Sequence, residues 1–168
     1  MENHFSLFQI APRFMIDEKT LESAYFEIQS RIHPDKHALA SDVDKKLAIQ
    51  WAAHVNDAYK ILKNPVKRAQ YLCELNGAPL NMESNTNMSK EFLIQQMEWR
   101  EKLLDAKEKK DNSVIDNLLD TLSVSKSELL DLVSSQLNDL SFISAIETVR
   151  KLIFLEKFEK EINFSLND

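Results

Sequence analysis

The chain has 168 residues, of which 43% are hydrophobic and 29% charged. This composition is typical of a soluble globular protein with one domain or two small ones. It holds one glycine and four prolines and no run of about 18 apolar residues, which favours long helices and argues against a transmembrane helix.

Charge is divided unevenly along the chain. Residues 1–78 hold ten Lys+Arg and ten Asp+Glu, whereas residues 79–168 hold eleven and seventeen, so the net charge of −6 lies in the second part. An acidic surface disfavours nucleic acid and anionic membranes as partners. The N-terminus lacks a basic region followed by an apolar run, and the lone Cys73 cannot form an intrachain disulfide, so we expect a cytoplasmic protein.

The first predicted elements are a short helix or turn within residues 4–10 and a helical hairpin. Apolar residues at helical spacing mark both arms of the hairpin. In the first arm, after a cap at Asp17, they are Leu21, Ala24, Tyr25, Ile28 and Ile32; in the second, after a cap at Ser41, they are Leu47, Trp51, Val55, Ala58 and Leu62. Pro34 should end the first arm, so that the chain reverses and the two stripes face each other.

A shorter helix should follow from Val66 to Leu75. Asn64 is a good N-cap and Pro65 suits the first helical position. The pair Asn76-Gly77 is typical of a helix end. Residues 76–88 are rich in Asn, Ser and Thr and form the best linker candidate.

Three amphipathic helices should form a bundle after the linker. They are expected from Lys90 to about Lys109 after a cap at Ser89, from about Asn112 to Leu137 with a possible bend at Ser123-Val124-Ser125, and from just after Ser141 to roughly Asn163.

The first bundle helix carries two apolar stripes where one suffices. Phe92, Trp99, Leu103 and Ala106 suit the core. The second stripe, rimmed by Glu98, Arg100 and Glu101, comprises Leu93, Met97 and Leu104, with Ile94 beside it. In the last helix the core stripe is Ala145, Ile146, Val149, Leu152 and Ile153, and Phe154 falls off it. Spacing alone leaves open whether these extra residues pack inside the protein or form a binding surface.

The hairpin resembles the J-domain, which stimulates ATP hydrolysis by DnaK-type chaperones. The resemblance rests on His33-Pro34-Asp35 between two helices and on Lys67-Arg68-Ala69-Gln70-Tyr71 in the short helix from Val66 to Leu75. It covers residues 1–75. It implies a chaperone-binding site made of His33, Pro34, Asp35, Arg31 and Lys36.

The whole chain resembles the HscB family of co-chaperones in iron–sulfur cluster assembly. Two further stretches carry this likeness, Phe92-Leu93-x-x-Gln96-x-Glu98-x-Arg100-Glu101 and Thr148-Val149-Arg150-Lys151-Leu152-x-Phe154-Leu155. The resemblance implies an all-α, L-shaped arrangement: a J-domain (1–75), a linker (76–88) and a three-helix bundle (89–168). It also implies partners, the chaperone HscA and the scaffold IscU, and a scaffold-binding surface of Leu93, Ile94, Met97, Glu98, Arg100, Glu101 and Phe154.

Two other functions fit parts of the sequence. One is a J-domain co-chaperone of a general DnaK-type chaperone that serves unfolded clients. The chain lacks the Gly/Phe-rich segment and zinc-binding cysteines of such proteins. The second helix carries few basic residues, mainly Arg31, with Lys19 at its start and Lys36 just beyond, and this thin basic face suits a dedicated partner better. The other is an enzyme or metal site at His33, Asp35 and His37. A metal site needs converging ligands with supporting groups, so we expect no catalytic residue, metal or cofactor.

Overall fold

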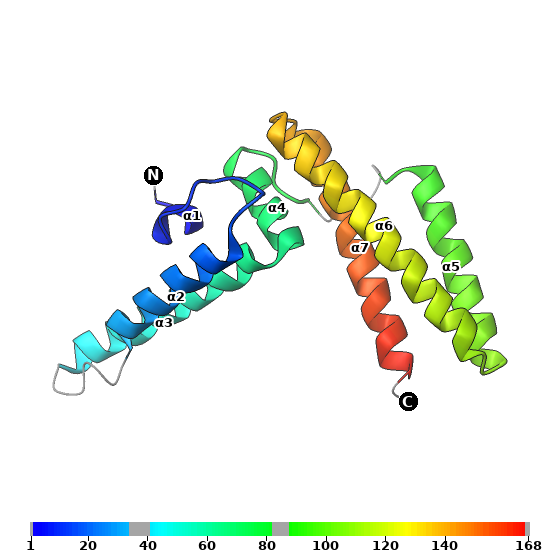
Figure 1. Ribbon diagram of the computed structural model, residues 1–168, viewed down its shortest axis with the longest axis horizontal. Coiled ribbons are helices and arrows are strands. Elements are labelled where there is room, and N and C mark those ends of the chain that lie inside the picture. Colours follow the sequence, from blue (N-terminus) through cyan, green and yellow to red (C-terminus); the bar gives the residue numbers. More distant parts are fainter. Residues whose placement is uncertain (1, 34–40, 82–87, 167–168) are drawn as a thin grey trace. The chain divides into compact units, whose positions relative to one another are not determined.

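The computed structural model describes residues 2–33, 41–81 and 88–166, and the regular structure in these ranges is entirely helical (Figure 1). The helices are α1 (His4–Leu7), α2 (Glu18–Ile32), α3 (Asp42–Lys63), α4 (Pro65–Leu75), α5 (Lys90–Glu108), α6 (Asn112–Asn138) and α7 (Phe142–Leu166). The predicted all-α fold is confirmed.

The chain forms two compact units, Met1–Leu72 and Cys73–Asp168. The domain limits that the sequence suggested, 1–75, 76–88 and 89–168, and their L-shaped arrangement stay predictions. No helix in the described part of the chain combines the length and the apolar character needed to cross a membrane.

Polar side chains cap the helices at the predicted positions. Each accepts backbone N–H groups of the first turn over 2.9–3.2 Å: Asp17 from Lys19, Ser41 from Asp44, Asn64 from Val66 and Lys67, and Ser89 from Phe92. These bonds satisfy donors that have no partner inside the helix. After α4, Gly77 adopts a φ of +81°, a conformation that glycine tolerates best.

The first unit is built on the antiparallel pair α2 and α3. The Tyr25 ring stacks on Tyr59 with ring centroids 4.0 Å apart, and the Tyr25 hydroxyl donates to Asn56. One turn further along α2, Gln29 Nε2 donates to the Ala52 carbonyl at 3.3 Å and to Asn56 Oδ1 at 3.0 Å. The later residue of α2 therefore contacts the earlier residue of α3, so the two helices run antiparallel, as predicted.

The apolar stripe of α3 departs from the prediction near the tip of the hairpin. Val55, along with Ala58 and Leu62, is buried as expected, but Leu47 and Trp51 are 49% and 50% exposed. Ala48 is buried instead, so the covered face lies one residue further along the helix. The reason is geometric: two helices alone cover a narrow strip, and large side chains at its margin stay half in solvent.

Two residues of the Lys67–Tyr71 stretch hold the first unit together. Arg68 is only 6% exposed and donates through Nε to the Phe14 carbonyl at 2.7 Å and through Nη1 to the Leu62 carbonyl at 2.6 Å. The Tyr71 hydroxyl accepts the backbone N–H of His4 at 3.0 Å. This stretch therefore fixes α1 and the segment before α2 onto the hairpin.

The second unit contains the bundle α5, α6 and α7. Its core joins residues of all three helices: Met88, Phe92, Trp99, Leu103, Ala106, Ile115, Leu118, Leu122, Leu155, Phe158 and Ile162. The four residues expected to form the core face of α5 are among them, as predicted. Helix α6 is continuous through residues 123–125.

Helix α7 has a wider buried face than its predicted stripe. Ala145, Ile146, Val149 and Leu152 are buried as expected, but Ile153 is only half-buried, and the buried face continues through Leu155, Phe158 and Ile162. The helix packs along α6 and also contributes to the core shared with α5. Contact with two neighbours explains why its apolar residues do not form one narrow stripe.

Candidate functional site

The first candidate surface is the C-terminal end of α2, which leads into the predicted chaperone-binding tip. His33 is the exposed residue that ends the helix, with φ −58° and ψ +132°. This extended backbone is the conformation favoured before a proline. Pro34, Asp35 and Lys36, the other tip residues that the sequence predicts, lie outside the described residues.

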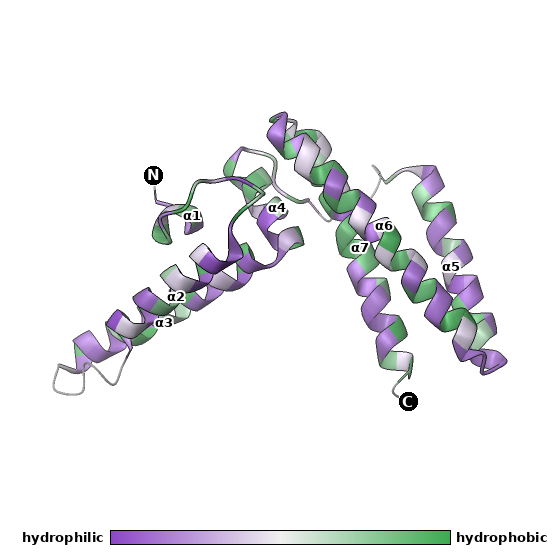
Figure 2. Cartoon of the chain, in the orientation of Figure 1, coloured by the Kyte–Doolittle hydropathy of each residue, from purple (hydrophilic) through white to green (hydrophobic). Residues whose placement is uncertain are grey.

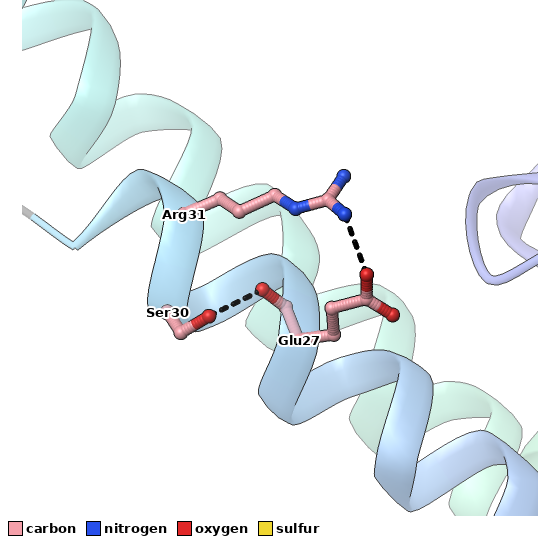
Figure 3. A network of polar contacts seen from close by, with 3 residues as sticks. All are labelled: Glu27, Ser30 and Arg31. Carbon is pink, nitrogen blue, oxygen red and sulfur yellow. Dashed lines mark hydrogen bonds and ion pairs between the residues drawn. The ribbon is translucent and has the colours of Figure 1, made fainter.

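Arg31 lies one turn from Glu27 and pairs with it on the surface of α2 (Figure 3). Its Nη2 lies 2.5 Å from Glu27 Oε1, and the Ser30 hydroxyl donates to the Glu27 carbonyl at 2.7 Å. Both charged side chains are well exposed, 72% for Arg31 and 63% for Glu27. An exposed pair of this kind adds little stability, so the Arg31 guanidinium remains available to a partner.

The second candidate surface is the exposed face of α5, a helix along which hydrophobic and hydrophilic residues alternate (Figure 2). Leu93, Ile94, Met97 and Leu104, which we name the α5 patch, have exposed fractions of 46%, 47%, 62% and 65%. Since the core face of the same helix is buried, the second stripe predicted from the sequence is a real surface feature. Leu104 belongs to it although the family resemblance did not assign it to the site.

Charged residues flank the α5 patch, and they are not equivalent. Glu98 and Glu101 are exposed. Arg100 reaches α7, where its Nη1 lies 2.8 Å from Glu161 Oε2 and its guanidinium lies 4.8 Å from the centroid of the Phe158 ring. Arg100 therefore has a structural contact in addition to its predicted place at the binding surface.

Phe154 of α7 is less exposed than the residues of the α5 patch. Its side chain is half-buried and packs against the core cluster of the second unit. The ring is thus partly a core residue, because α7 faces both of its neighbours. The spacing of apolar residues along α7 does not reveal that this helix packs against both α5 and α6. The assignment of Phe154 to a scaffold-binding surface stays a prediction.

Comparisons with known proteins agree with this architecture. Residues 3–71 match the family model of the DnaJ domain, and residues 88–163 match that of the HSCB C-terminal oligomerisation domain. A helical chain that begins with a DnaJ domain is a J-domain protein.

Similar sequences show to which family of J-domain proteins the chain belongs. A co-chaperone protein HscB homolog of Burkholderia thailandensis is 44% identical over 161 residues, which cover 96% of this chain and 92% of the relative. A homolog from Ralstonia nicotianae is 43% identical, with 95% and 92% covered. The chain belongs to the HscB family of J-domain co-chaperones.

Solved structures show the same fold over nearly the full length. The chaperone HscB from Vibrio cholerae is 32% identical with a TM-score of 0.88, and the match covers 99% of this chain and 98% of that one. The human co-chaperone protein HscB is 28% identical with a TM-score of 0.92, and 98% and 82% of the two chains are covered.

Proposed function

We propose that this co-chaperone binds the iron–sulfur scaffold IscU, delivers it to the Hsp70-type chaperone HscA and stimulates ATP hydrolysis by HscA in the cytoplasm. The observation that carries the proposal is the α5 patch, an exposed apolar surface on the bundle of a chain that belongs to the HscB family. Exposed apolar residues with a charged rim suit a protein partner.

The two surfaces have separate tasks in this proposal. The bundle, residues 89–168, holds the scaffold through Leu93, Ile94, Met97, Glu98, Arg100, Glu101 and Phe154. The J-domain, residues 1–75, contacts the chaperone through Arg31, His33, Pro34, Asp35 and Lys36. Asp35 accepts charge-assisted hydrogen bonds from a chaperone arginine, and no group of the co-chaperone enters the hydrolysis reaction itself.

Two substitutions test this division of labour. His33→Gln should abolish stimulation of HscA and leave binding of purified IscU unchanged. Met97→Ala should weaken IscU binding by roughly fivefold or more, the loss expected for an interface residue that contributes over 1 kcal/mol, and retain the stimulation that occurs without scaffold. Normal stimulation by the His33→Gln protein would refute the chaperone-binding assignment.

The competing function is service of unfolded clients for a general DnaK-type chaperone. Binding of folded IscU together with no binding of a denatured model protein supports the scaffold-specific function, and the reverse result supports the general one. Sedimentation at several concentrations is the necessary control, because the matching bundle model is described as an oligomerisation domain. If the mass of the parent chain doubles at high concentration while the Met97→Ala protein stays monomeric, the α5 patch binds a second copy of this chain instead of the scaffold.

A further inference from the structure

Lys151 of α7 lies beside the α5 patch and is not part of the scaffold-binding set described above. Its Nζ lies 5.6 Å from the centroid of the Phe92 ring, a distance at which a cation is attracted to an aromatic face. Lys151 also lines an open depression in the surface of the second unit together with Ile94, Glu91 and Glu98. The same depression therefore includes an apolar residue of the patch, two acidic residues and the Lys151 side chain, which is its one basic group among the described residues.

Lys151 forms no ion pair in the part of the chain that the structure describes. Within the described ranges no Asp or Glu lies at ion-pairing distance from Lys151, whereas Lys126 of α6 lies 3.2 Å from Glu156. Lys151 is half-buried, and its Nζ lies over the Phe92 ring of α5 where the two residues line the depression. A lysine held in this way offers a positioned cation at low cost in side-chain entropy.

Resting on the proposed scaffold-binding function, we propose that Lys151 is a specificity-determining residue of that surface. It recognises a carboxylate of the scaffold that lies next to the apolar residue covering Ile94. The charges of the surface define the complementary segment: an apolar side chain, an acidic residue toward Lys151, and a basic residue toward Glu98 and Glu101. A segment with this pattern gains attraction at both ends, whereas one with the charges reversed is repelled at both.

The test is a titration of the full-length chain with purified IscU at two salt concentrations. Lys151→Met retains an unbranched apolar side chain and removes the charge, and it should weaken binding by roughly three- to tenfold, as expected for a partly desolvated charge pair. Lys151→Glu should weaken binding further. The affinity of the Lys151→Met protein should also fall less steeply with salt than that of the parent.

Lys160→Met is the matched control, because Lys160 is an exposed lysine of the same helix and lies more than one turn beyond Phe154. It should change the affinity by less than about twofold, as surface charges away from an interface usually do. Melting curves of all variants check that α7 still packs, and Met97→Ala reports on the scaffold site independently.

The outcomes separate the inference from the proposed function. If Met97→Ala weakens binding and both Lys151 variants bind as the parent does, the role of Lys151 is refuted and the scaffold site stands. If Lys160→Met weakens binding as much as Lys151→Met, the effect is general electrostatics and the specific role is refuted as well. If the parent chain does not bind IscU, the proposed function fails and this inference fails with it.

Discussion

Arg100 of α5 and Glu161 of α7 form an ion pair at 2.8 Å, with both side chains about half exposed. The Arg100 guanidinium also lies over the Phe158 ring, a residue of the bundle core. This contact joins two helices next to the α5 patch. It gives a residue predicted from family resemblance to bind a partner a role in the free protein too.

The first prediction concerns the strength of that contact. Because the pair is half exposed, a double-mutant cycle with Arg100→Met and Glu161→Gln should give a coupling free energy of only about 0.5 kcal/mol in unfolding by urea. If Arg100 also contacts the scaffold, Arg100→Met should weaken IscU binding more than Glu161→Gln. Equal losses in binding would mean that Arg100 acts only by holding α5 against α7.

The second prediction concerns Phe154, whose half-buried ring packs against the core. Phe154→Ala should lower the free energy of unfolding by about 1–2 kcal/mol, less than the 3–5 kcal/mol of a fully buried phenylalanine. Phe154→Leu retains most of the packing volume, so it should lower stability less while still removing the ring from the surface. Comparison of the two in urea unfolding and in IscU titrations separates the packing effect from binding. An unchanged stability of Phe154→Ala would show that the packing contact has no energetic weight.

The third prediction concerns the buried Arg68, which donates to the carbonyl groups of Phe14 and Leu62. Arg68→Met should destabilise the chain by about 1–3 kcal/mol, because it leaves acceptors without their donors in a buried setting. Lys67→Met is the control, since Lys67 is exposed on the same helix, and it should be nearly neutral. Urea unfolding measures both. Similar stabilities of the two variants would contradict a structural role for Arg68.

The fourth prediction concerns the pH dependence of α1 packing. The His4 ring stacks on Tyr71 with centroids 4.4 Å apart and lies 5.9 Å from the ring of His54. Burial lowers the pKa of His4, Coulomb interaction with the nearby His54 lowers it further, and Asp57 opposes the shift. The folded chain therefore favours the neutral imidazole.

A lowered folded pKa means that the unfolded chain binds more protons in the range between the two pKa values. The stabilising contribution of neutral His4 should be complete above the ordinary value of 6.5 and be lost as the pH falls through the folded pKa. Urea unfolding across this range should show a decrease in stability toward acid that His4→Gln reduces. An identical pH profile for the His4→Gln protein would exclude His4 as its source.

Much of the fold was accessible from local sequence. Asp17, Ser41, Asn64 and Ser89 cap helices at the predicted positions because a short polar side chain followed by helical apolar spacing is a local signal. The second stripe of α5 was equally readable, since the angular position of Leu93 and Met97 depends only on the helix to which they belong.

The tertiary structure decided what each apolar residue contacts. Trp51 lies on a regular stripe yet is half exposed, because the cover near the tip is narrow. Phe154 lies off a stripe yet packs on the core, because α7 has two neighbours. Lys151 gains its place over the Phe92 ring only when α5 and α7, distant in sequence, come together. Helical periodicity determines which face a residue occupies, but burial depends on the neighbouring elements, and these are set by contacts that are distant along the chain.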